Sequence, residues 1–412
     1  MQAFTRTGEF VPSPLRPLFW LALALSVGAA VSLGVTRFAY GLLLPGMRAD
    51  LGWTYTLAGA MNTANAVGYL LGALAMPGLM RRVSPTVLLW SGSLLAALFM
   101  GLCGFFTDAF VLLVQRLLAG LASALVFVSG GLLAARLGSR APAHAGLLLG
   151  VYYGGTGVGI VLSALLVPWV LDASQGEVHS WRFAWWALAL LCFAATALLR
   201  WPARVMAQWE LLPQADAPAE STRPARFSVR LFGFALAGYG LFGVGYIGYM
   251  TFAVALLRTQ GASAQAVTVF YGLLGLAVVA SSRIWAGLLN RHLGGGAMAR
   301  LNALLGVAVV LPALTHSFGV VVFSGLLFGG VFLSIVASST ALVRHNLPPA
   351  AWATGISAFT IVFAAGQIVG PTLVGWIADG AGGLERGLLV SAITLWLGAL
   401  LAWRQKPLAF AV

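Results

Sequence analysis

Three arginines lie inside long apolar stretches of this chain: Arg37, Arg116 and Arg283. A charge at the centre of a membrane helix costs roughly 2.5–3.5 kcal/mol on insertion scales, and a guanidinium does not lose its proton to avoid that cost. Each arginine therefore needs an anion, backbone carbonyls or water as a partner. Because a guanidinium binds a carboxylate through two parallel hydrogen bonds, these residues indicate a site for an organic anion.

Arg37 is the first candidate for this site. It lies eight residues before Pro45, which is about 12 Å along a helix, so its side chain does not easily reach water. Gly34 and Gly41 share its helix face by their spacing and leave room for a ligand. In the functional interpretation Arg37 is a fixed cation that binds a substrate carboxylate. In the alternative it is a structural arginine, satisfied by carbonyls of a neighbouring helix.

Arg116 and Arg283 are open to the same two interpretations. Arg116 lies about seven residues into its apolar stretch, roughly two helical turns, and could either join the anion site or bond the backbone of the first helix. Arg283 follows two serines and is about 10 Å along a helix from Arg291. Its long stem could therefore extend toward water, or its guanidinium could bind an anion.

Uncharged polar residues complete the predicted site: Tyr40, Tyr246, Tyr249 and Gln367. A tyrosine in the middle of a membrane helix needs a partner for its hydroxyl, and a substrate cavity would supply one. Tyr246 and Tyr249 lie on one face of a glycine-rich stretch. The alternative for all four residues is close helix packing, in which side chains such as Gln367 only join neighbouring helices.

The composition indicates that these residues act inside a lipid bilayer. Hydrophobic residues make up 60% of the 412-residue chain and charged residues 8%, against about 45–50% and about 25% in soluble domains. So few charges cannot cover a surface in water. This excludes a soluble enzyme, a nucleic-acid-binding domain and a disordered chain, although the net charge is +13.

Twelve apolar stretches are long enough to cross a bilayer, which takes about 20 residues in a helix. In the first half they cover residues 18–44, 55–80, 86–106, 109–137, 143–171 and 181–201; in the second half they cover 231–257, 264–289, 297–314, 318–343, 351–378 and 384–403. Lipid offers no partners for backbone groups, so the stretches must be helical. We predict an all-α integral membrane protein with six-helix halves at 1–201 and 230–412, joined by a cytoplasmic linker at 202–229 that is rich in proline and charge.

The positions of the basic residues predict the orientation. With the N-terminus in the cytoplasm, sixteen of the 23 lysines and arginines face the cytoplasm and four face outside, and the other three are the arginines within the spans. Both termini would then be cytoplasmic. The two halves also look like a repeat with an offset near 210 residues; Arg48 and Arg258 are one matching pair. Such parallel repeats are typical of transporters.

With these features the chain resembles the major facilitator superfamily (MFS) over essentially its whole length. Arg116, four residues before Gly120, is similar to the family's fourth-helix pattern. The run Gly366-Gln-Ile-Val-Gly370-Pro371 is similar to its glycine-proline pattern in the eleventh helix. The resemblance implies the MFS fold and conformational roles for Gly120, Gly366, Gly370 and Pro371.

Within the superfamily, the run Arg37-Phe-Ala-Tyr40-Gly41 followed by Pro45 resembles the bacterial YbfB/YjiJ-type transporters. That resemblance implies transport across the bacterial inner membrane and fixes no substrate. Residues 78–85 depart from the family's loop pattern, because they carry Arg81 and Arg82 without an acidic residue. The gating salt bridges usual at this loop are therefore not expected.

Together these features favour a secondary active transporter of a small organic anion, first of all a carboxylate, that works as a monomer. All ten acidic residues fall in predicted loops or tails and the five histidines near span ends, so no residue is assigned as a proton carrier; coupling to protons is implied only by family habit. No residue set predicts an enzyme, a metal site or a cofactor, and Lys406 is the one lysine, so a lysine in a phosphate-binding loop is excluded. The alternatives are a multidrug or metabolite exporter of MFS type, or a non-transporting sensor of the same fold.

Overall fold

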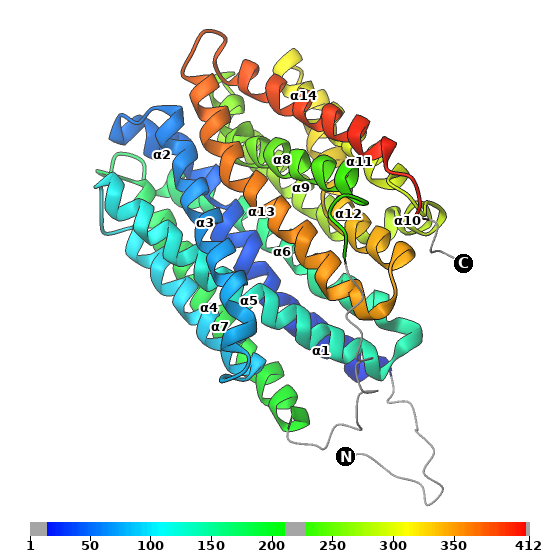
Figure 1. The fold of residues 1–412 in the computed structure, drawn as a ribbon. Helices are drawn as coiled ribbons and strands as arrows, with labels where there is room; N and C mark the ends of the chain where they lie inside the picture. The colour runs from blue at the N-terminus through cyan, green and yellow to red at the C-terminus, as the bar shows by residue number, and fades with distance from the viewer. Residues whose placement is uncertain (1–14, 211–226, 409–412) are drawn as a thin grey trace, which may run out of the picture.

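The computed structural model describes residues 15–210 and 227–408, and every regular element in these two ranges is a helix (Figure 1). The first half consists of α1 (Leu15–Ala29), η1 (Ala30–Phe38), α2 (Tyr40–Leu51), α3 (Tyr55–Leu79), α4 (Pro85–Cys103), α5 (Ala109–Arg140), η2 (Pro142–His144), α6 (Ala145–Ala173) and α7 (Trp181–Glu210). The second half consists of α8 (Gly233–Thr259), α9 (Ala264–Ile284), α10 (Ala286–Arg291), α11 (Gly296–Leu314), α12 (Phe318–Asn346), α13 (Pro349–Ala378) and α14 (Gly383–Arg404). The predicted all-α fold is confirmed.

Eleven of the described helical segments are long and apolar enough to cross a membrane. The first of them, Leu15–Leu51, contains α1, η1 and α2 in one span of 37 residues. The twelfth predicted span is α3, a helix of 25 residues that packs between α5 and α13. Its buried Asn62 and Asn65 make it the more polar helix, yet its place in the bundle is that of a membrane helix. The predicted twelve-span architecture is therefore confirmed.

Three differences from the predicted boundaries are the largest. Helix α7 continues past residue 201 to Glu210, so nine residues of the predicted linker are helical; Trp209 lies under the guanidinium of Arg140, at 3.7 Å. Residues 211–226 of that linker lie outside the described residues. The first span ends at Leu51 instead of residue 44. The predicted span 264–289 is divided at Trp285, whose indole donates a hydrogen bond to the carbonyl of Gly330 at 2.8 Å.

Glycines let the helices of each half approach to backbone contact. A Cβ added at Gly155 of α6 would lie 1.9 Å from the carbonyl oxygen of Ser26, and one at Gly120 of α5 would lie 2.0 Å from that of Asn65. Such close approach replaces the hydrophobic driving force that lipid cannot provide between helices. The α1–α6 and α3–α5 contacts therefore require glycine at these positions, because any side chain there would collide with the backbone of the neighbouring helix.

We expect Gly155→Val to lower the free energy of unfolding by about 3 kcal/mol, because overpacking a tight contact forces the backbones apart. The matched control is Gly146→Val in the same helix, where an added Cβ meets no atom within 4 Å. Thermal unfolding of the two variants in detergent measures the difference. Equal midpoints for both variants would contradict the packing role of Gly155.

The two halves meet mainly along two pairs of helices, α6 with α9 and α3 with α13. Figure 1 shows α3 and α13 running side by side through the bundle. At the end where α3 begins and α13 ends, Tyr55 and Gly375 are in backbone contact, since a Cβ on the glycine would lie 2.2 Å from the carbonyl oxygen of Tyr55. The same face of α13 continues to Thr360 and Ser357, which are both exposed. The halves are therefore in contact at the end of α13 that carries Gly375 and Asp379, next to Tyr55 at the start of α3. We call this end of the bundle the closed end.

Candidate functional site

Arg37 sits in a π-helix in the middle of the first span. This element, η1 (Ala30–Phe38), interrupts the α-helical span between α1 and α2. The side chain of Thr36 donates to the carbonyl of Val31, five residues earlier, at 2.6 Å. π-Helical turns inside longer helices are uncommon and frequently occur at functional sites. The backbone conformation around Arg37 is therefore one that favours a functional role for this residue.

Two nitrogen atoms of the Arg37 guanidinium are buried without a partner. The residue is 2% exposed, and its Nε and Nη2 atoms have no hydrogen bond to any described residue. The ring of Tyr69 on α3 lies 5.9 Å from the guanidinium carbon. A buried charge that lacks hydrogen bonds is costly, so this arrangement leaves two donors available for an anion.

Arg116 is held by the protein itself. Its Nη1 donates to the carbonyl of Thr36 at 2.7 Å, and its Nη2 donates to Oδ1 of Asn62 at 3.1 Å. The rings of Tyr40 and Trp185 lie 5.1 and 5.5 Å from the guanidinium carbon. The carbonyl of Thr36 belongs to η1, so Arg116 bonds the backbone of the first span directly beside Arg37. This geometry matches the structural alternative for Arg116.

The predicted uncharged site residues divide into two groups. Tyr246 lies near both the amide of Gln367 and the guanidinium of Arg37. Tyr40 instead donates to the carbonyl of Ala58 at 2.8 Å, and the hydroxyl of Tyr249 lies 2.7 Å from that of Ser324. The structure therefore brings Arg37, Tyr246 and Gln367 together and uses Tyr40 and Tyr249 in packing between helices.

Arg283 does not join this group of residues. It is exposed and lies in the last turn of α9, at the end of the bundle opposite the closed end. Gly275, Val279 and Arg283 are each one helical turn apart and so lie along one face of α9. Gly275 and Val279 both contact Gly157 of α6. Arg283 thus lies on the face of α9 that is turned toward the first half.

Tyr69, and the rings of Phe332 and Phe363 that stack beside Tyr246, were not predicted as site residues from the sequence. The ring of Tyr69 lies 5.9 Å from the guanidinium carbon of Arg37, and Tyr246 is also near it. The ring of Tyr246 lies 5.0 Å from that of Phe332 and 5.5 Å from that of Phe363. No spacing rule links α3, α8, α12 and α13, so only the assembled bundle could reveal this group. We call Arg37, Tyr69, Tyr246 and Gln367 the central site.

The residues of the glycine-proline pattern lie at helix contacts near the central site. An added Cβ at Gly366 would lie 2.3 Å from the carbonyl oxygen of Gly240, and one at Gly370 would lie 2.5 Å from that of Val244. The carbonyl oxygen of Pro371 lies 2.2 Å from a Cβ added at Gly59 in the other half. These positions join α13 to α8 on one side and to α3 on the other.

At the closed end, a carboxylate from the second half binds the start of a helix in the first half. The oxygens of Asp379 accept hydrogen bonds from the backbone N–H groups of Tyr55 and Thr56, at 2.7 and 2.8 Å, and from the hydroxyl of Thr56 at 2.6 Å. A helix N-terminus favours negative charge. Partial burial alone would raise the pKa of Asp379, but these bonds and the charge of Arg48 lower it below its ordinary value.

We expect this contact to weaken when Asp379 is protonated. Its pKa is lower in the closed arrangement than in a state where the contact is broken, so the stabilisation is full above the ordinary carboxyl pKa of about 3.9 and is lost as the pH falls through the lowered pKa. Since Asp379 is largely exposed, we expect a contribution of about 1 kcal/mol, less than a buried charged hydrogen bond would give. Asp379→Asn should remove this pH dependence. At neutral pH it should also raise about fivefold the fraction of molecules in which the two halves are separated at the closed end.

Spin labels at the exposed positions Val178 and Leu314 would report the distance between the halves at this end. The matched control is Glu385→Gln, which removes a charge beside the same loop. A distance distribution that is identical in the native protein and in Asp379→Asn would show that Asp379 does not hold the halves together.

Comparison with known proteins places these features among membrane transporters. The family described as "Uncharacterised MFS-type transporter YbfB" matches residues 29–403. A bacterial homologue of the human lysosomal transporter Spinster, solved in an inward-facing and unoccupied conformation, superposes with a TM-score of 0.72 at 15% identity over 94% of this chain and 97% of that one. The nucleoside transporter NupG superposes with a TM-score of 0.68 at 13% identity over 94% of this chain and 100% of that one.

A sequence relative is the chloramphenicol resistance protein of Streptomyces lividans. It is 30% identical over 184 residues, which cover 43% of this chain and 43% of that protein. The match therefore spans less than half the length of the relative. The fold and the family are shared along nearly the whole chain, whereas this closer sequence likeness is confined to a part of it.

Proposed function

Because this chain belongs to the family of YbfB-type MFS transporters, we propose that it carries a small organic anion, a carboxylate, across the bacterial inner membrane by alternating access. Transporters of this fold bind their substrates near the middle of the bilayer, between the two halves. Arg37, Tyr69, Tyr246 and Gln367 lie on helices of both halves, as such a site requires.

One observation carries the anion assignment: the buried guanidinium of Arg37 has two nitrogen donors without a partner among the described residues. A carboxylate would satisfy the charge and at least one of these donors, in a site where water is largely excluded. The hydroxyl of Tyr246 and the amide of Gln367 would bind further polar groups of the substrate. In this proposal Arg116 holds η1 in place, and Tyr40 and Tyr249 support the helices around the site.

The proposal also assigns the direction of access. With both termini in the cytoplasm, the closed end faces outside, and the exposed face of α13 at Ser357 and Thr360 faces the cytoplasm. Arg283 would then lie near the cytoplasmic entrance and attract anions toward the site. If protons are co-transported, they would travel with the substrate, because the described acidic residues lie at helix ends and in loops. We further propose that the protein works as a monomer.

A second candidate function is export of drugs or metabolites. The partial likeness to a chloramphenicol resistance protein and the stacked rings of Tyr246, Phe332 and Phe363 favour it. An apolar substrate would bind against these rings only by burying apolar surface. It would leave the charge of Arg37 without a partner, which makes this candidate the weaker of the two.

Solute counterflow in proteoliposomes separates the two candidates. Small aliphatic and aromatic carboxylates are compared one by one with their own amides, which have nearly the same shape and no charge. We expect exchange of at least one carboxylate and none of the matching amide. Equal exchange of an acid and its amide, or exchange of neutral drugs alone, would overturn the anion assignment and favour export.

A further inference from the structure

A groove outside the central site lies between the first turns of α4 and the last part of α7. Its volume is about 280 Å³, and the residues that line it are Thr86, Val87, Trp90, Arg200, Ala203, Arg204 and Ala207. It belongs to the first half alone and lies at the end of the bundle opposite the closed end. The alanines on α7 leave the space that larger side chains would fill.

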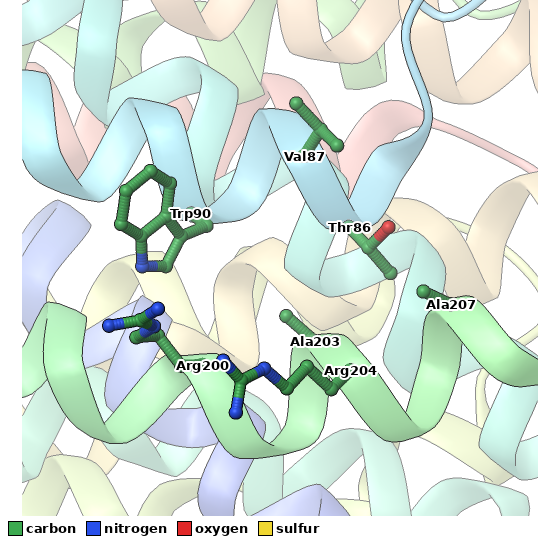
Figure 2. Close-up of a pocket in the computed structure, with 7 residues that line it drawn as sticks. All are labelled: Thr86, Val87, Trp90, Arg200, Ala203, Arg204 and Ala207. Carbon is green, nitrogen blue, oxygen red and sulfur yellow. The ribbon is translucent and has the colours of Figure 1, made fainter.

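Two arginines stand beside each other along this groove. Arg200 and Arg204 are one helical turn apart and both are exposed. Figure 2 shows Arg204 extended back along α7 toward Arg200, with the guanidinium of Arg200 near Trp90 on the opposite wall. Neither guanidinium forms an ion pair with a residue that the structure describes. Like charges at this spacing repel each other, so an anion between them would relieve the repulsion.

The groove offers a third donor from its other wall. The indole Nε1–H of Trp90 is buried and has no hydrogen-bond partner in the described part of the chain. Tryptophan is common at the level of the lipid headgroups, where one edge of the ring is in an apolar environment and the N–H is near polar groups. The three donors thus converge on one groove from two helices (Figure 2).

The surface around the groove is one that contacts lipid. Val87 on one wall is 52% exposed, and Leu198 and Trp201, on either side of Arg200 in the sequence, are 66% and 53% exposed. Large apolar side chains with this much exposure, in helices that span the membrane, face acyl chains. A ligand of this groove would therefore have both an anionic group and an apolar part.

From these observations we propose that the groove binds the phosphate of an anionic phospholipid. Arg200, Arg204 and the Trp90 indole hold the phosphate. The small residues Ala203 and Ala207, toward the end of α7, leave room for the rest of the headgroup, and the acyl chains extend from the phosphate along the exposed Leu198 toward the middle of the bilayer. Basic pockets between membrane helices recognise lipid headgroups by this chemistry. The bound lipid would join α4 to α7 at the membrane surface. The proposal does not depend on the identity of the transported substrate.

Native mass spectrometry of the detergent-purified protein tests this site. Cardiolipin, phosphatidylglycerol and phosphatidylcholine are titrated in turn, and the bound fraction gives an apparent affinity for each. We expect the two anionic lipids to bind at least tenfold more tightly than phosphatidylcholine. We also expect Arg200→Gln with Arg204→Gln to abolish that preference.

The matched control is Arg291→Gln with Arg404→Gln. These exposed arginines lie at the same end of the bundle in the second half, so the pair removes the same charge at a distance from the groove. We expect less than a twofold change in lipid affinity. An equal loss in both double variants would mean that lipid binding reflects total charge, and would overturn the site.

Two further arms distinguish a lipid held in the groove from a free phosphate ion and from lipid attracted by surface charge. Trp90→Phe removes only the indole donor and keeps an aromatic ring, so it tests the groove in a protein with unchanged charge; we expect a threefold to tenfold weaker binding of cardiolipin. Inorganic phosphate is added as a competitor up to millimolar concentration, and we expect it not to displace the lipid. Displacement by phosphate alone, or unchanged binding in Trp90→Phe, would contradict a built lipid site.

Discussion

Arg37→Gln is expected to abolish carboxylate transport while making the protein more stable. Removing one partner of a buried, hydrogen-bonded charge pair costs about 2–5 kcal/mol, which lowers the affinity for the substrate by roughly 30-fold to several thousand-fold. Without substrate, the same change removes a buried charge that has unpaired Nε and Nη2 atoms. We therefore expect the free energy of unfolding to rise by about 1–3 kcal/mol.

Transport in proteoliposomes and thermal unfolding in detergent measure the two effects in one preparation. Arg37→Lys is the control, because it keeps the charge and loses the planar pair of donors; we expect weak but measurable transport. A stability that falls in Arg37→Gln would mean that Arg37 holds the fold together, and that its unpaired atoms have a structural partner in the membrane.

Arg116→Gln is expected to have the opposite effect on stability. Arg116 donates to the carbonyl of Thr36 and to Oδ1 of Asn62, and both acceptors would be left buried and unpaired. At about 1.5–3 kcal/mol for each hydrogen bond to a charged group, we expect a loss of roughly 3 kcal/mol or more. Because Thr36 precedes Arg37 in η1, transport should fall as a consequence of the displaced helix.

The control for this prediction is the preceding residue. Gln115 has a buried Oε1 without a hydrogen-bond partner in the described residues, so Gln115→Leu should leave the unfolding temperature unchanged or raise it. The comparison is made by thermal unfolding of both variants in the same detergent. If Arg116→Gln is as stable as the native protein, the two hydrogen bonds do not secure η1.

The cost of charge in lipid identified Arg37 and Arg116 in the sequence, but it could not say which of them would find a partner inside the protein. That depends on one backbone carbonyl, of Thr36, and on the π-helix that contains it. Residues 30–38 have no sequence pattern that distinguishes a π-helix from an α-helix. Apolar length predicted the helices well for a simpler reason, since lipid allows a long apolar stretch no other structure.

The contacts between the halves were also beyond the sequence. Asp379 binds the start of α3 from a position 324 residues away in the chain, and as a single acidic residue in a short loop it carried no signal. Tyr69 was missed for the same reason, because its relation to Arg37 exists only after α3 packs against the first span. The sixth span was predicted to end at residue 201, where the linker rich in proline and charge begins, yet α7 continues to Glu210.

The central claim is that the unpaired nitrogen donors of Arg37 bind the carboxylate of the substrate. It is tested most directly by a thermal-shift screen of the purified native protein and of Arg37→Gln against carboxylates and their amides. A ligand at 100 times its dissociation constant adds about 2.7 kcal/mol to the free energy of unfolding, which is readily measured. We predict that one class of carboxylate stabilises the native protein, that its amide does not, and that neither stabilises Arg37→Gln; equal stabilisation of both proteins by the same carboxylate would contradict the claim.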